Sequence, residues 1–253
     1  MTNSGRVALI TGATSGIGRA TAIELASRGD FVIVSGRDEQ RGSETCAAIR
    51  EAGGDCALVL ADLTDTESTN ALARDALAAG GGRIDILVNN AGGALFDDGN
   101  QFKPTTSVSA SEYERVFALN ARAPFLLTAA LAPTMVEGGS GAIVNILAIS
   151  ADRGFPGVSV FGGAKAAVAS FTRTWAVEFA PAVRVNAIDL GTIDTPIHAE
   201  NQGLLASLAP TIPARRVGLP EEVSSVVAFL TSDAASYVSG AVLPVDGGRL
   251  IAF

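Results

Sequence analysis

The chain has 253 residues, of which 48% are hydrophobic and only 17% are charged; this composition suits strands covered by helices on both faces. Acidic residues outnumber basic ones by 26 to 18, and the formal net charge of −8 argues against nucleic acid or an anionic membrane as the main partner. No signal peptide precedes the first apolar stretch, and Arg122, Pro124 and Pro133 interrupt the apolar run 121–136, so we expect a soluble, cytoplasmic protein.

The two cysteines, Cys46 and Cys56, are not at metal-ligand spacing and have no histidine nearby. We therefore expect free, buried or half-buried thiols in preference to a disulfide or a redox pair. We expect no metal site.

A glycine-rich turn lies between an expected strand, 7–10, and an expected helix, 19–28. The strand is a short apolar run, and the helix has apolar residues at helical spacing. Glycine lets a backbone approach a pyrophosphate closely, and the free N–H groups and the dipole of the helix favour its negative charge. The spacing G-x-x-x-G-x-G therefore predicts a variant of the dinucleotide fingerprint, with a tight turn without ligand as the alternative. The expected cofactor-binding residues of this turn are Gly12, Thr14, Ser15, Gly16, Ile17 and Gly18.

Strands and helices alternate along the rest of the chain. The further strands are expected at 31–34, 56–61, 84–88, 142–147, 183–188 and 241–245, and the further helices at 39–52, 66–79, 111–136, with Pro124 inside it, and 162–180. With right-handed crossovers, this order predicts an α/β fold, a Rossmann-type doubly wound sheet of seven parallel strands with helices on both faces, in a three-layer sandwich. No linker or repeat interrupts the pattern, so we expect one domain over 1–253.

Residues that directly follow strands are the ones expected to bind a ligand, because sites in such sheets lie outside the carboxyl ends of the strands. After the second strand, Ser35 and Gly36 precede Arg37, whose guanidinium suits the 2′-phosphate of NADP; an acidic residue there would bind the ribose of NAD. We therefore favour NADP(H), with NAD(H) as the alternative if Arg37 is a solvated surface charge. The residues expected at the adenine are Asp62 and Leu63, and those expected at a ribose are Asn89, Asn90, Ala91 and Gly92.

The motifs together resemble the short-chain dehydrogenase/reductase family over essentially the whole chain. They are Thr11-Gly12-x-x-x-Gly16-x-Gly18, Asp62, Asn89-Asn90-Ala91-Gly92, Asn120, Lys165 and Asp246-Gly247-Gly248. The resemblance implies NAD(P)(H) binding and the interconversion of alcohols and carbonyls. It also implies a catalytic serine, tyrosine, lysine and asparagine, in which the tyrosine exchanges a proton with the substrate oxygen. In the family, the lysine lowers the pKa of that phenol and binds the nicotinamide ribose, and backbone groups at Ile193 and Thr195 meet the carboxamide.

The chain departs from the family at two catalytic positions. Phe161 stands four residues before Lys165, where the tyrosine is expected, and Ala148 stands thirteen residues earlier, where the serine is expected. Asn120 and Lys165 remain, but neither replacement carries the oxygen that its role requires. Because general acid catalysis contributes about 100-fold to 10,000-fold, we expect a catalytically impaired site.

Three interpretations are open at this point. The chain is a deliberately inactivated reductase, a natural protein that binds the dinucleotide without the redox relay, or an enzyme with relocated chemistry. The candidates for relocated chemistry are Ser150, Ser159, Asp97, Asp98, Asp152 and His198. We expect the two serines to be loop hydroxyls, the acidic residues to face water, and the histidine to lie in the lid.

The segments around the site predict the kind of substrate and the assembly. A long polar loop between Gly92 and Ser111 is expected at the mouth of the pocket, and a short lid helix is expected over 199–208. Its leucines suit a small, partly apolar substrate. The resemblance implies pairing through the helices 111–136 and 162–180, so we expect a homodimer or a homotetramer with twofold symmetry.

Overall fold

The computed structural model describes residues 5–94, 96–196 and 202–252. Seven parallel strands form one sheet in the order β3-β2-β1-β4-β5-β6-β7. The strands are β1 Val7–Thr11, β2 Phe31–Gly36, β3 Asp55–Leu60, β4 Ile86–Asn89, β5 Gly141–Ile146, β6 Val183–Leu190 and β7 Val242–Val245. The predicted α/β class and Rossmann-type sheet are therefore confirmed.

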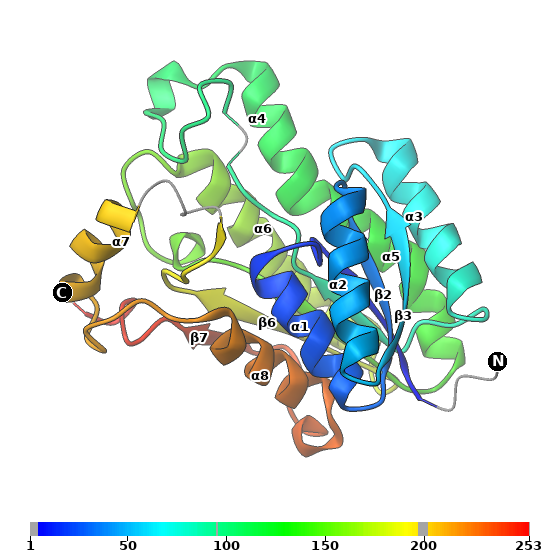
Figure 1. Ribbon diagram of the computed structural model, residues 1–253. Coiled ribbons are helices and arrows are strands. Elements are labelled where there is room, and N and C mark those ends of the chain that lie inside the picture. Colours follow the sequence, from blue (N-terminus) through cyan, green and yellow to red (C-terminus); the bar gives the residue numbers. More distant parts are fainter. Residues whose placement is uncertain (1–4, 95, 197–201, 253) are drawn as a thin grey trace.

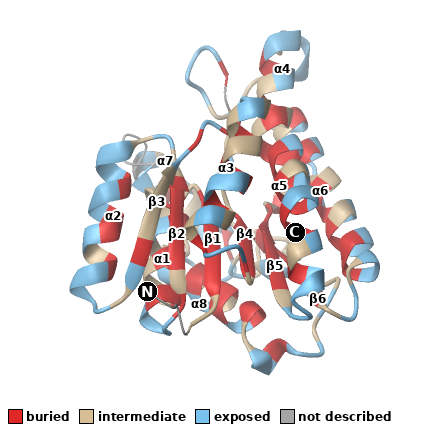
Figure 2. Cartoon of the chain, turned by 90° about the vertical axis from the view of Figure 1, so that its right-hand side faces the viewer, coloured by how far each residue is buried: buried red, intermediate tan, exposed pale blue. Residues whose placement is uncertain are grey.

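Helices cover both faces of the sheet (Figure 1). The helices α1 Gly16–Ser27, α2 Glu39–Glu51 and α8 Pro220–Thr231 pack on one face, and α3 Thr66–Ala79, α5 Ala123–Glu137 and α6 Ser159–Glu178 pack on the other. The helix α4 Ala110–Phe117 precedes α5, and α7 Gln202–Leu208 lies between β6 and α8. The central strands are buried between the two helical layers (Figure 2), because apolar residues on both faces of a parallel sheet need cover.

Side-chain caps determine where several helices begin. The carboxylates of Asp38 and Asp65 accept from backbone N–H groups of α2 and α3, and Ser109 forms a capping box with Glu112 at α4. Such caps satisfy N–H groups that have no partner inside the helix. At α1, by contrast, the Ser15 side chain makes no capping hydrogen bond. The first N–H groups of α1 therefore lack a side-chain cap.

The long helix expected at 111–136 is correct in extent but not in regularity. A π-helical turn at Ala118–Arg122 joins α4 to α5, and Pro124 follows it in the first turn of α5, so Pro124 lies inside the continuous helical stretch Ala110–Glu137, as predicted. Proline has no N–H to donate to a preceding carbonyl, so the pattern of backbone hydrogen bonds in the helix changes at this position. The helix α8 was not among the predicted helices, although Pro220 at its start and two glutamates in its first turn are helix-start signals.

Other boundaries moved by one to three residues. The strand β4 begins at Ile86 and not at residue 84, and α6 begins at Ser159 and not at residue 162. The second shift places Phe161 inside the first turn of α6. It therefore lies on the same rigid helix as Lys165.

The helical stretch Ala110–Glu137 is, within the described residues, the one helix long and apolar enough to cross a membrane by length and composition. In this fold, 56% of its apolar window is buried, against α3 and the sheet. It is a core helix. Cys46 and Cys56 are both free and buried, as predicted, and burial raises the pKa of the Cys56 thiol to about 12.

Candidate active site

The turn after β1 is built by close approach of the backbone. Gly12 has a positive φ of 65°, and a Cβ on Gly18 would lie 2.2 Å from the Gly12 carbonyl oxygen. Asn90, after β4, donates from Nδ2 to the Thr11 carbonyl at 2.8 Å and to the Gly12 carbonyl at 3.3 Å. The Asn90 amide therefore fastens the glycine turn to the neighbouring strand end.

The same turn meets segments from β2 and β6. A Cβ on Gly36 would lie 2.5 Å from Cγ2 of Thr14, and a Cβ on Gly16 would lie 3.3 Å from Cγ2 of Thr195. Ile193, buried just before Thr195, forms an isolated bridge with the backbone of residue 218. The uncapped start of α1, which begins at Gly16 next to Ser15 and Ile17, thus lies beside the ends of three strands. This geometry fits a dinucleotide, because unpaired N–H groups at a helix start attract phosphate.

The expected adenine end lies after β2 and β3. Arg37 is exposed, and the Asp62 carboxylate accepts from the N–H and the hydroxyl of Thr64 at 2.9 and 2.7 Å. Partial burial raises the pKa of Asp62, but the Thr64 hydrogen bonds and the charge of Arg37 outweigh it, so the pKa lies below its usual range. The side chain of Leu63 is largely buried in the core and has 6% of its surface exposed.

The π-helical turn presents Asn120 toward the segment that follows β4. Its Nδ2 donates to the carbonyls of Gly93 and Val116, both at 2.8 Å, and its Oδ1 accepts from the Gly93 N–H at 3.0 Å. A Cβ on Gly92 would lie 2.8 Å from Asn120 Oδ1 and 2.9 Å from Lys165 Nζ. The turn formed by Asn90, Ala91 and Gly92 therefore brings these two polar groups together.

Lys165 is buried on α6, with 4% of its surface exposed. Its Nζ donates to the Ile146 carbonyl at 2.8 Å and lies 5.6 Å from the centre of the Phe161 ring. Burial lowers the pKa of this ammonium group to about 8. Among the described residues, no carboxylate forms a salt bridge with it, so no opposite charge offsets the cost of burial.

The two positions without oxygen lie near this lysine in the fold. Ala148 is half-buried directly after β5, where it precedes the 3₁₀ turn Ile149–Ala151. The Phe161 ring packs against an apolar cluster of Phe96, Val116 and Val160. The side of the Phe161 ring that faces the loop between Gly92 and Ser111 therefore makes apolar contacts.

The residues considered for relocated chemistry are scattered. The exposed Asp97 pairs with Arg115, and the Ser159 hydroxyl lies 2.9 Å from that of Thr105. Asp98 and Asp152 are exposed, as expected. Ser150 differs from the expected loop hydroxyl, because its Oγ is buried and has no hydrogen-bond partner among the described residues. His198 and the first part of the expected lid helix, 199–201, lie outside the described residues; its remainder is α7.

Sequence reasoning missed two acidic residues near this region. Glu112 accepts from the Asp97 N–H at 2.9 Å and from Lys103 Nζ at 2.5 Å, and so holds the long loop onto α4. Its signal was present as the S-x-x-E pattern that begins at Ser109. The other is Asp189, fully buried at the end of β6, an acidic residue between Ile188 and Leu190.

Comparison with known proteins agrees with this architecture. A family model described as Enoyl-(Acyl carrier protein) reductase matches residues 12–249. Cis-4-hydroxycyclohexanecarboxylate dehydrogenase from Sinomonas cyclohexanicum is 42% identical over 249 residues, which are 96% of each chain. Cyclopentanol dehydrogenase from Comamonas testosteroni is 37% identical over 248 residues, again 96% of each chain.

A solved structure shows the same fold. It is described as an NAD(P) dependent gluconate 5-dehydrogenase from Beutenbergia cavernae with NADP bound at low occupancy; it has 37% sequence identity, covers 98% of each chain and has a TM-score of 0.90. The chain belongs to the short-chain dehydrogenase/reductase family, as its motifs predicted. The family comprises NAD(P)-binding dehydrogenases and reductases of alcohols and ketones.

Proposed function

We propose that residues 1–253 form one NADP(H)-binding domain of an alcohol–ketone oxidoreductase whose proton relay is impaired. The observation that carries the proposal is the uncapped, glycine-built start of α1 beside Thr195 and Asn90. The glycine turn, Asn90 and Lys165 support dinucleotide binding, whereas Ala148 and Phe161 lack the oxygens that would act on a substrate.

The preference for NADP(H) rests on Arg37. Its guanidinium is exposed directly after β2, and Gly36 carries no side chain that would compete for the adenosine ribose. The bound NADP of the gluconate 5-dehydrogenase relative supports this choice. Arg37→Asp should reverse the preference, because a carboxylate repels a 2′-phosphate and accepts from ribose hydroxyls. Calorimetric titration with both cofactors tests this. Arg74→Asp, on the exposed side of α3, is the charge-matched control. Equal binding of both cofactors by the unchanged chain would show that Arg37 does not set a preference.

The remaining polar groups suit cofactor positioning more than proton transfer. Lys165 Nζ, beside Gly92 and Asn120, is placed to donate to ribose hydroxyls. When bound, the nicotinamide supplies or accepts the hydride. The carbonyl oxygen of a substrate would need a donor from positions 148 and 161, and neither alanine nor phenylalanine has one. The chain should therefore bind cofactor and reduce ketones very slowly.

We further propose alicyclic alcohols and ketones as the substrate class. The named substrates of the two dehydrogenase relatives carry the hydroxyl on a saturated ring. The cluster of Phe96, Val116 and Val160 around the Phe161 ring suits such a skeleton, because it offers apolar contact without hydrogen bonds.

The deciding experiment restores both oxygens, Ala148→Ser with Phe161→Tyr. NADPH consumption over a panel of cyclic ketones should rise by about 100-fold to 10,000-fold in the double variant. Either single variant should recover much less, because the two groups act on one oxygen. High activity in the unchanged chain would overturn the impaired-site proposal and favour relocated chemistry. If neither the unchanged chain nor the double variant consumes NADPH although both bind the cofactor, the result would favour a protein that binds the dinucleotide without redox turnover.

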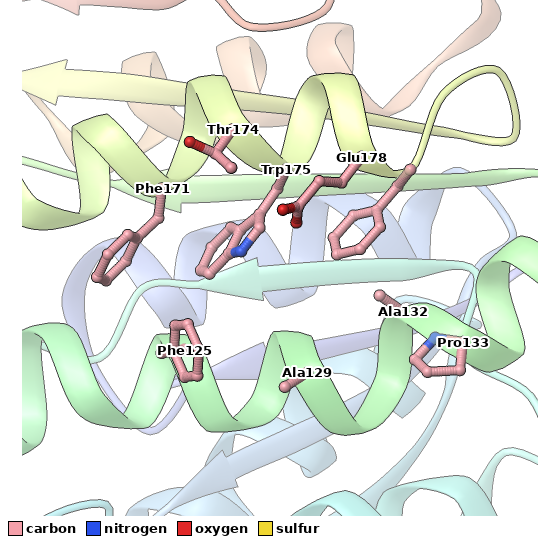
Figure 3. A pocket seen from close by; sticks show the side chains of 9 residues that line it. Phe125, Ala129, Ala132, Pro133, Phe171, Thr174, Trp175 and Glu178 are labelled. Atoms are coloured by element: carbon pink, nitrogen blue, oxygen red, sulfur yellow. The ribbon is translucent and has the colours of Figure 1, made fainter.

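We propose a homodimer, or a homotetramer built from it, that pairs through α5 and α6. Between these helices lies an apolar groove of about 360 Å³, lined by Phe125, Phe171 and Trp175 (Figure 3). Phe125, which lines the groove, is 45% exposed, so a second copy of this face would remove apolar surface from water. Light scattering should show a dimer or tetramer at about micromolar concentration, and Phe125→Asp should dissociate it, whereas Tyr237→Asp, at a fully exposed ring, should not. A monomeric unchanged chain would refute the assembly.

Free thiols support a reducing compartment such as the cytoplasm.

A further inference from the structure

The carboxyl group of Asp189 is the most anomalous polar group in the described part of the chain. The residue is 0% exposed at the end of β6, and neither of its oxygens accepts a hydrogen bond from a donor among the described residues. Burying an ionised carboxylate without a partner is very unfavourable, and buried polar groups in folded proteins are almost always paired. The group therefore calls for a physical explanation.

The described charged groups that act on Asp189 are both acidic. Asp152 follows the 3₁₀ turn Ile149–Ala151, and its carboxyl group lies within hydrogen-bonding range of the Asp189 carboxyl group. Asp246 follows β7, and its oxygens already accept from the N–H groups of Gly248 and Leu250 at 2.7 and 2.6 Å. No charged side chain of β5 or α6 is among the described groups that act on Asp189. Of these two carboxylates, only Asp152 lies within hydrogen-bonding range of Asp189, so it is the one that can accept a hydrogen bond from a protonated Asp189.

We propose that Asp189 and Asp152 share one proton and form a latch that ties the turn 149–152 to the end of β6, and that loss of this proton loosens the turn. The protonated Asp189 donates its O–H to the Asp152 carboxylate, which gives a partner to an otherwise unpaired buried group. Burial, followed by the charges of Asp152 and Asp246, raises the pKa of Asp189 to about 7. The latch is therefore closed in acid and weakens as the pH approaches neutrality.

The position of the latch links it to the candidate site. The turn begins directly after Ala148, and a Cβ on Gly162 of α6 would lie 2.5 Å from the Ser150 carbonyl oxygen, so the turn also supports the start of the helix that carries Phe161. The other end of the latch, β6, leads into Ile193. The latch therefore determines how well ordered two walls of the site are. It would do so whether or not the chain turns over a substrate.

The direct test is a titration of the full chain by NMR with ¹³C-labelled aspartate carboxyl groups. Asp189, assigned by its loss in Asp189→Asn, should titrate near neutral pH, whereas an ordinary aspartate titrates near about 4. Asp152→Asn should lower the Asp189 midpoint, because it removes a negative charge and adds an N–H donor. Asp75→Asn, an exposed carboxyl group on α3, should leave the midpoint unchanged. An ordinary midpoint for Asp189, or a midpoint insensitive to Asp152→Asn, would overturn the proposal.

Amide hydrogen exchange tests the mechanical part of the latch. After correction for the intrinsic rate, the opening constant of segment 148–158 should rise by about tenfold per pH unit between about pH 5 and 7, and level off above. In Asp189→Asn the opening constant should not change with pH, because the neutral amide can still donate to Asp152. The same pH response in both proteins would show that Asp189 does not hold the turn, and would overturn the latch.

Discussion

Lys165→Met should stabilise the folded chain near neutral pH while removing its affinity for the cofactor. Burial lowers the pKa of this lysine from 10.5 to about 8, and one pKa unit corresponds to about 1.4 kcal/mol, so the buried charge costs about 3 kcal/mol at neutral pH. Methionine has a similar length and fills the space. Loss of the donor to the Ile146 carbonyl costs about 1 kcal/mol, so we expect a net gain of about 2 kcal/mol.

The pH dependence separates this explanation from a simple packing effect. The unfolded chain binds the proton more tightly than the folded chain, so the stability of the unchanged protein should rise between about pH 8 and 10.5. Urea unfolding at about pH 7 and about pH 10 should therefore show the gain at neutral pH shrinking in alkali. Lys103→Met is the matched control, since its salt bridge to Glu112 should make that substitution destabilising. If Lys165→Met destabilises the chain at neutral pH, or if its effect does not change with pH, the buried-charge reasoning is wrong.

Three further predictions concern the glycine turn, the acid pair and the loop clamp. Gly18→Ala should abolish dinucleotide binding by calorimetry and lower stability by about 1–3 kcal/mol, because the new Cβ would lie 2.2 Å from the Gly12 carbonyl oxygen. Asp189→Asn should flatten the pH dependence of Tm, since the raised pKa of Asp189 makes the unchanged chain lose stability from about pH 4 up to its folded-state pKa near about 7; an unaltered slope would count against a raised pKa. Glu112→Gln should speed limited proteolysis of the loop before α4, because it weakens the bond from Lys103; unchanged cleavage would mean that other contacts hold the loop.

Local patterns along the chain were enough to predict the layout of the sheet and the candidate cofactor residues. Short apolar runs alternating with helical periodicity are a local signal, so all seven strands were found, with small shifts at their ends. The glycine turn and Arg37 follow strands directly, and the rule that ligands meet the carboxyl ends of parallel strands needs no coordinates. The missing oxygens at Ala148 and Phe161 were also visible in the sequence, because they depend on residue identity alone.

What the sequence by itself determined is therefore the family and the fold class; the residues that face the cofactor, the single domain and the NADP preference stay predictions. Only the tertiary structure decided which of these residues touch. Gly92 lies between Asn120 and Lys165 because a π-helical turn rotates the asparagine inward. The regular spacing of apolar residues in the sequence does not predict that rotation. The proposed pairing of Asp189 with Asp152 would join residues 37 positions apart in the chain. Burial and long-range proximity set the ionisation of such groups, and both arise only when the strands and the turns after them are packed together.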